Sequence, residues 1–143
     1  MKILVFLFFI FSFIQLNLIA EENEQIWSYS HGNYESHKFS HLEKINTSNV
    51  NSLKKAWVYK NGFIPKTRNN SQVIPIFTGN SIITSSVDGY LISLDPENGF
   101  EKWRLKLPKP VAKRGMLFLK KERIILVTTG KGVFAIDETL GKI

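Results

Sequence analysis

The C-terminal half of the chain repeats itself at a spacing of 42 residues, and this repeat limits the possible folds more than any other feature. The two copies align without a gap, although few residues are identical. Internal repeats with periods of roughly 20 to 50 residues are typical of solenoids, propellers and other repeat architectures. The apolar and turn positions that coincide are Ile82 with Ile124, Ile83 with Ile125, Leu94 with Ile136, Asp95 with Asp137 and Gly99 with Gly141.

Each repeat unit is predicted to contain short strands joined by tight turns. In the first unit Asp88-Gly89 is a hairpin signal, and Asp95 to Gly99 is a turn in which Pro96 suits the second position. We therefore expect one four-stranded antiparallel sheet per unit. The predicted strands of the first unit are residues 73–77, 81–87, 90–94 and 101–107.

A period of about 40–45 residues with four strands is what one blade of a β-propeller requires. Propellers have about four to eight blades. Residues 72–143 hold about two repeats, and the second is incomplete because the counterpart of Trp103 would fall two residues after Ile143. The prediction is an all-β fold, an incomplete β-propeller that is the N-terminal fragment of a larger one.

The first 20 residues are predicted to be a secretory signal peptide. Lys2 gives a positive start, residues 3–14 are almost wholly apolar, and Ala20 is a small residue at the expected cleavage point. This apolar run is shorter than the roughly 20 residues of a membrane-spanning helix. We expect an exported, periplasmic protein, and an uncleaved inner-membrane anchor is the alternative.

Residues 21–71 are interpreted as a leader segment. Thr47 or Ser48 is expected to cap a short helix, in which Val50 and Leu53 would share one face. Residues 54–60, which contain Trp57, alternate in a way that fits a strand. The leader is therefore predicted to contribute one short helix and one strand.

Composition excludes several classes of function. The chain has no cysteine, so it has neither a disulfide nor a thiolate metal site, and no metal ligand set is predicted. The formal net charge is +7, but the basic residues are spread along the chain. A solvated, mildly basic surface is expected, and nucleic acid is not expected as a partner because the chain is predicted to be exported.

Several motifs resemble those of quinoprotein dehydrogenases, the enzymes that depend on pyrroloquinoline quinone (PQQ). Residues 45–50 followed by 53–59 (LKKAWVY) are similar to their N-terminal signature. Residues 88–103, with Asp95, Gly99 and Trp103, resemble their repeated tryptophan docking motif. The resemblance covers roughly residues 25–143. It implies that Trp57 and Trp103 are structural residues that pack between adjacent blades.

The resemblance also implies a cofactor site in the central channel. Arg114 resembles the arginine that pairs with the carboxylates of PQQ, and a surface arginine in a basic loop is the alternative. Gln72 occupies a position that is often glutamate in the family, where it could donate a hydrogen bond without charge. Calcium belongs to the intact family, but its ligands and the catalytic aspartate are expected in later blades. The vicinal cysteine pair of the alcohol-oxidising branch is absent, which favours a sugar-dehydrogenase-like branch.

Three functions are compatible with these features. The first is part of a periplasmic dehydrogenase that oxidises an alcohol or sugar and passes electrons to an acceptor. The second is a non-enzymatic propeller scaffold of the kind that assists outer-membrane protein assembly, and the third is an inert truncated fragment. Membrane contact is expected only through an uncleaved N-terminal segment. Whether this chain is itself an enzyme stays open at this point.

Overall fold

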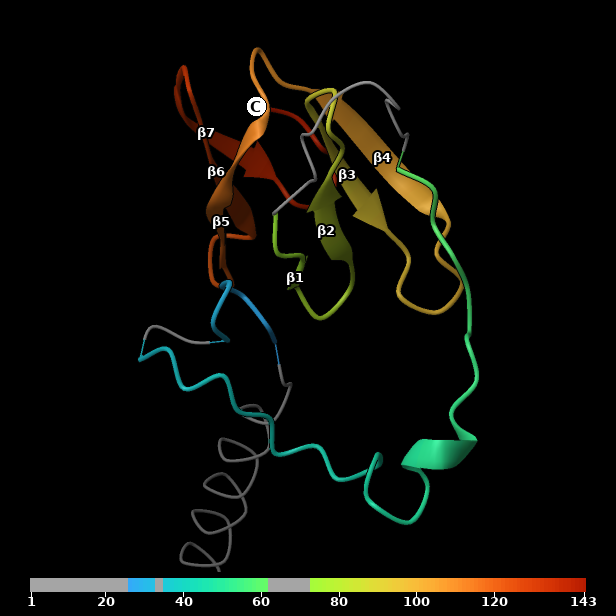
Figure 1. The fold of residues 1–143 in the computed structure, drawn as a ribbon. Helices are drawn as coiled ribbons and strands as arrows, with labels where there is room; N and C mark the ends of the chain where they lie inside the picture. Colours follow the sequence, from blue (N-terminus) through green and yellow to red (C-terminus); the bar gives the residue numbers. More distant parts are fainter. Residues whose placement is uncertain (1–25, 33–34, 62–72) are drawn as a thin grey trace, which may run out of the picture.

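A computed structural model describes residues 26–32, 35–61 and 73–143 and shows two antiparallel β-sheets packed face to face (Figure 1). The described part of the chain is all-β apart from one short 3-10 helix, η2 (Val50–Ser52). The first sheet contains β1 (Ile76–Phe77), β2 (Ile82–Ser85), β3 (Tyr90–Leu94) and β4 (Glu101–Lys106). The second contains β5 (Val111–Leu119), β6 (Ile124–Thr129) and β7 (Gly132–Asp137).

The first sheet has the predicted form of a blade, with the strands in chain order β1-β2-β3-β4. All four predicted strands are present, although the first is reduced to two residues. Gly89 adopts a φ of +89° in the β2–β3 hairpin, a left-handed conformation that favours glycine. The Asp88-Gly89 signal therefore marks the hairpin correctly.

The Asp-Gly turn recurs with the same geometry in both sheets. The side-chain oxygen of Asp95 accepts hydrogen bonds from the backbone N–H groups two and three residues later, at 2.9 and 3.3 Å. Asp137 does the same at 2.9 and 2.7 Å. Both turns end in a glycine with positive φ, +75° at Gly99 and +64° at Gly141. The repeat identified in the sequence is therefore a structural repeat.

The gapless alignment nevertheless misplaces one strand by a residue. Ile82 pairs with Leu94 in the first sheet, so the repeat predicts that Ile124 pairs with Ile136. Ile124 pairs instead with Asp137, which makes Ile125 the structural counterpart of Ile82. The cause is the β6–β7 hairpin, which is one residue shorter than the β2–β3 hairpin.

The hydrophobic core lies between the two sheets. Inward-facing side chains of both sheets form one buried cluster, and burying such side chains contributes roughly 1.5–3 kcal/mol each. Neither sheet can bury this face alone, which is the reason that consecutive blades fold against each other. The cluster consists of Ile76, Ile83, Leu91, Leu107, Val111, Met116, Phe118, Ile125, Val127 and Ile136.

The predicted short helix is present, but the leader differs from the prediction in two details. The short helix is a single 3-10 turn whose N-cap is Asn49, with no side-chain capping bond, rather than a helix capped by Thr47 or Ser48. Residues 54–60 are extended but are not a strand, because they form no β-ladder with any described strand. A strand exists only through hydrogen bonds to a neighbour, so a strand-like sequence pattern is not sufficient.

Two further predictions fall outside the described residues, namely the signal peptide at 1–20 and the side chain of Gln72. Within the described ranges no helix has the length and apolarity needed to cross a bilayer.

Candidate functional site

Trp103 joins the two blades. It projects from β4 and lies against Gly141 in the turn of the second sheet, where an added Cβ would come within 2.5 Å of the indole ring. The indole Nε1 donates a hydrogen bond of 2.8 Å to the backbone oxygen of Glu138. Glycine is therefore needed at position 141 both for its positive φ and for the close approach of the ring.

Trp57 makes the same contacts one blade earlier. Its ring lies against Gly99, where a Cβ would come within 2.5 Å, and its Nε1 donates a 3.1 Å hydrogen bond to the backbone oxygen of Pro96. Pro96 and Glu138 are 42 residues apart and occupy the same position of the repeat. Residues 53–61 are thus placed against the first sheet as β4 is placed against the second. The predicted structural roles of both tryptophans are confirmed.

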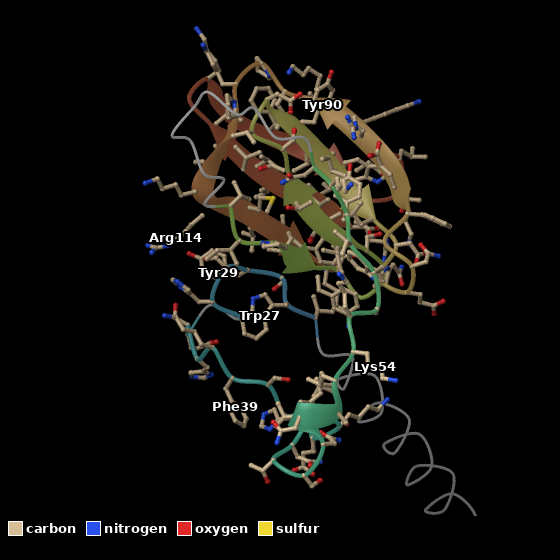
Figure 2. The ribbon with its side chains drawn as sticks, turned by 45° about the vertical axis from the view of Figure 1, so that its right-hand side comes forward. Trp27, Tyr29, Phe39, Lys54, Tyr90 and Arg114 are labelled. Carbon is tan, nitrogen blue, oxygen red and sulfur yellow. The ribbon has the colours of Figure 1, made fainter. Side chains whose placement is uncertain are left out.

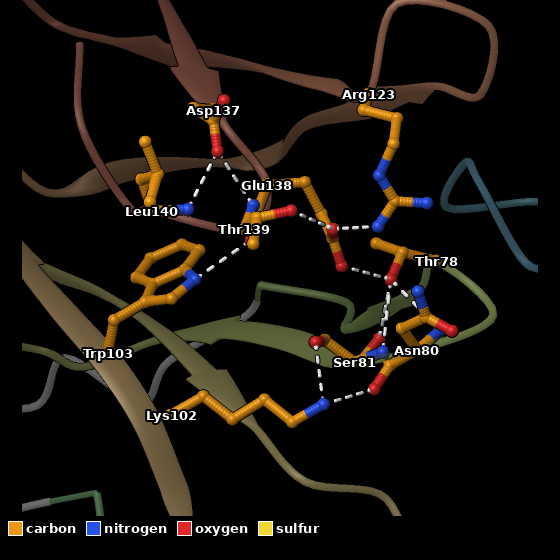
Figure 3. A network of polar contacts seen from close by, with 10 residues as sticks. All are labelled: Thr78, Asn80, Ser81, Lys102, Trp103, Arg123, Asp137, Glu138, Thr139 and Leu140. Atoms are coloured by element: carbon orange, nitrogen blue, oxygen red, sulfur yellow. Dashed lines mark hydrogen bonds and ion pairs between the residues drawn. The ribbon is translucent and has the colours of Figure 1, made fainter.

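A buried carboxylate also connects the blades, and the sequence analysis missed it. Glu138, only 2% exposed, accepts a 2.8 Å hydrogen bond from the Thr78 hydroxyl in the β1–β2 turn (Figure 3). Its other carboxylate oxygen pairs with Arg123, which precedes β6. Buried charges require such partners. The sequence offered one signal of this contact: the repeat position that holds Pro96 in the first unit holds the charged Glu138 in the second.

The N-terminal part of the leader, residues 27–29, bridges the first strands of the two blades. Trp27 forms a β-bridge with Phe77 in β1, and Tyr29 forms one with Leu117 in β5. The Phe118 N–H adds a 2.8 Å hydrogen bond to the backbone oxygen of the intervening serine. β1 and β5 are the first strands of consecutive blades, and each is paired with its own sheet along one edge only. This segment therefore lies along the other edges of β1 and β5.

Arg114 lies on β5, close to this bridging segment (Figure 2). It sits where the pairing of β5 with β6 shifts register between Val111 and Met116, which marks a β-bulge. The side chain is exposed and makes no hydrogen bond or ion pair with any described residue. Gly115 follows it, and a Cβ there would lie 2.0 Å from the Thr128 hydroxyl. The bulge thus presents an exposed guanidinium from the first strand of the second sheet.

A second polar cluster lies on the outer strand of the first blade. Arg104 donates to Glu101 at 2.8 and 3.0 Å and to the Tyr59 hydroxyl at 3.0 Å. The hydrogen bond from Arg104 lowers the pKa of the Glu101 carboxyl. Partial burial raises the pKa of Tyr59. These contacts hold residues 53–61 alongside β4 and show no substrate-binding geometry.

The described residues contain no group of three or more His, Asp or Glu side chains arranged to hold a metal ion. The predicted role of Arg114 in binding the cofactor stays a prediction. The side chain has the chemistry that this role requires, because a guanidinium can donate paired hydrogen bonds to a carboxylate.

Comparisons with known proteins agree with this architecture. Residues 27–143 match the family described as "PQQ: Glucose/ethanol/alcohol dehydrogenase, beta-propeller domain". The quinoprotein glucose dehydrogenase of Escherichia coli (strain K12) is 33% identical over 89 residues, which is 59% of this chain and 11% of that protein. Quinoprotein glucose dehydrogenase A of Acinetobacter calcoaceticus is 42% identical over 72 residues, 47% of this chain and 9% of that one.

A solved structure shows the same fold. The europium-containing methanol dehydrogenase superimposes with a TM-score of 0.66 at 23% identity, over 85% of this chain and 23% of that chain. The chain thus spans a small part of the length of its relatives. Since the family match extends over residues 27–143 and the two described sheets are propeller blades joined by docked tryptophans, the chain belongs to the PQQ-dependent dehydrogenase β-propeller family.

Proposed function

We propose that this chain forms the first blades of a periplasmic PQQ-dependent dehydrogenase that oxidises a small sugar or alcohol. The observation that carries the proposal is Arg114, a free guanidinium held by a bulge in β5 beside the bridging segment of Trp27 and Tyr29. An exposed arginine in a loop would be mobile. Arg114 is instead part of a strand whose ends pair with β6 at Val111 and Leu119.

The role of Arg114 would be to bind and orient the cofactor. Each charge-assisted hydrogen bond to a carboxylate contributes about 1.5–3 kcal/mol, and a planar guanidinium also fixes the direction of its partner. When bound, PQQ would take up the two electrons and two protons released on oxidation of the substrate alcohol carbon. Gln72 could donate a further hydrogen bond. Calcium would be held by residues of later blades, which are not part of this chain.

Two observations favour a sugar as the substrate. Two of the relatives are named glucose dehydrogenases. In addition, Pro108 and Lys109 stand at about the place where the alcohol-oxidising branch carries a vicinal cysteine pair.

The test is a dye-linked dehydrogenase assay on the complete dehydrogenase, in which later blades accompany this chain, loaded with PQQ and Ca²⁺, using glucose and ethanol as alternative substrates. We expect PQQ-dependent reduction of the dye, faster with glucose. The variant Arg114→Ala should raise the PQQ concentration for half-maximal rate about 10-fold or more, since 1.4 kcal/mol corresponds to a factor of ten. Lys113→Ala, which removes the neighbouring exposed charge, is the matched control and should change it little. No PQQ-dependent rate with either substrate would reject the enzymatic function in favour of a scaffold.

Location is tested separately by fractionating cells that express the tagged protein. Recovery in the periplasmic fraction supports export with cleavage of the signal, whereas recovery with the inner membrane supports the uncleaved anchor. Recovery in the cytoplasm would contradict the proposed location.

A further inference from the structure

A polar cleft, here called the interblade cleft, lies between the two blades at the end of the sheets that carries the β1–β2 and β3–β4 turns. Its volume is about 470 Å³, within the range of ligand-binding pockets. The first blade contributes both turns and the start of β4, and the second contributes Arg123 and the turn after β7. None of these described lining residues belongs to the bridging segment or to the bulge that holds Arg114.

Two cations of the interblade cleft are held in place by the surrounding turns (Figure 3). Lys102 donates hydrogen bonds to the backbone oxygen of Asn80 at 2.6 Å and to the Ser81 hydroxyl at 3.4 Å. Arg123 pairs through Nη2 with the Glu138 carboxylate, which is only 2% exposed. Arg123 also has a φ of +54°, a conformation that is unfavourable for residues other than glycine. Residues held in such conformations cluster at functional sites.

The lining side chains keep hydrogen-bonding capacity that no described residue uses. A guanidinium has five N–H donors and an ammonium has three, whereas Arg123 engages one nitrogen and Lys102 reaches two acceptors. A single carboxylate oxygen of Asp95 is bonded, to the backbone of its own turn. Glu97 and Asn80 are exposed, and their side chains form no hydrogen bond or ion pair with a described residue. The interblade cleft therefore offers both donors and acceptors to a ligand.

We propose that the interblade cleft binds a small neutral saccharide. A hydroxyl group both donates and accepts hydrogen bonds, so a polyhydroxy ligand can use the donors and the acceptors of one cleft together. The lining charges, two cations and three carboxylates, nearly cancel, and a strongly charged ligand would be repelled by one of the two sets. The half-buried ring of Trp103 adds apolar surface for the C–H face of a sugar ring. This inference goes beyond the proposed enzymatic function and does not rest on it.

Hydrogen–deuterium exchange followed by mass spectrometry tests the proposal, because it locates the backbone amides that a ligand protects. The complete dehydrogenase is measured alone, with trehalose and with sulfate. Trehalose is a neutral disaccharide without a free anomeric hydroxyl, and sulfate is the anionic probe. We expect trehalose to protect the amides of the turns that line the cleft and to change exchange little in β5. The turn residues concerned are 79–81, 95–99 and 138–140.

Two substitutions remove single groups of the cleft, Lys102→Met a donor and Glu97→Ala an acceptor. Each should raise the trehalose concentration for half-maximal protection about 10-fold, the effect of losing one hydrogen bond to a charged group. Lys121→Met is the matched control, because Lys121 is an exposed lysine of the β5–β6 turn that does not line the cleft. It should leave this concentration unchanged.

Three results would overturn the proposal. The first is no protection of the cleft turns at about 10 mM trehalose, which would occupy most of a millimolar site. The second is protection by sulfate in place of trehalose, which would indicate an anion site. The third is protection by trehalose that neither Lys102→Met nor Glu97→Ala weakens relative to Lys121→Met. Because the readout is amide protection, each result is independent of dehydrogenase activity.

Discussion

The contact between Trp103 and Gly141 can be tested by adding a single methyl group. In Gly141→Ala the new Cβ would lie 2.5 Å from the indole ring, so the ring must move. A left-handed φ of +64° costs alanine about 1–2 kcal/mol. Loss of the 2.8 Å hydrogen bond to the Glu138 oxygen adds about 0.5–1.5 kcal/mol. We expect the free energy of unfolding to fall by about 2–3 kcal/mol.

Substitutions of two other glycines separate the cost of the backbone conformation from the cost of displacing the Trp103 ring. Gly89→Ala has the same kind of backbone conformation, with φ at +89°, but its Cβ would meet nothing closer than 3.5 Å. It should cost about 1–2 kcal/mol. Gly130→Ala has neither feature and should change stability by less than about 0.5 kcal/mol. Urea unfolding followed by circular dichroism gives all three values. If Gly141→Ala were no more destabilising than Gly89→Ala, the docking of Trp103 would not contribute as described.

Three further changes test individual contacts by the same urea titration. Glu138→Ala removes the acceptor of the Thr78 hydrogen bond across the blades and the partner of Arg123 within the second blade, and it should cost about 1–3 kcal/mol; an unchanged midpoint would mean that this carboxylate does not join the blades. Glu101 has a lowered pKa in the folded state because Arg104 donates to it, so its contribution is complete above its ordinary pKa of 4.5 and is lost as the pH falls through the lowered value. Glu101→Gln should therefore lose less stability than the unmodified protein between pH 6 and pH 3, and an equal loss would refute the pairing. Gly115→Ala places a Cβ 2.0 Å from the Thr128 hydroxyl and 3.0 Å from the Thr128 backbone oxygen, and it should cost about 1–3 kcal/mol by overpacking; full stability would show that the bulge is not tightly packed.

Much of the fold follows from the sequence because its turns carry strong local signals. Asp95, Gly99 and their counterparts 42 residues later fix two identical turns through side-chain hydrogen bonds and positive φ values. Strand order and the role of Trp103 follow from that repeat. The one-residue register change of β6 does not, because it arises from hairpin length and leaves the turn residues of both repeats aligned.

Features that depend on contacts between distant residues were harder to predict. Residues 54–60 have a strand-like pattern, but pairing depends on a neighbour that the pattern cannot reveal. The Glu138 carboxylate is 60 positions from its partner Thr78, and nothing local indicates that the two meet. For Arg114 the family resemblance suggested a cofactor role, and the structure adds the exposed side chain and the bulge that presents it. The role itself stays a prediction.

Equilibrium binding of PQQ tests the proposed cofactor role most directly. Isothermal titration of the complete dehydrogenase, as the unmodified protein and as the variants Arg114→Ala and Lys113→Ala, with PQQ in the presence of Ca²⁺ would give three dissociation constants. Saturable binding by the unmodified protein and by Lys113→Ala, with a dissociation constant at least about 10-fold higher for Arg114→Ala, is the predicted result. Equal affinities for the two variants, or no binding by the unmodified protein, would contradict the assignment of Arg114 to the cofactor carboxylates.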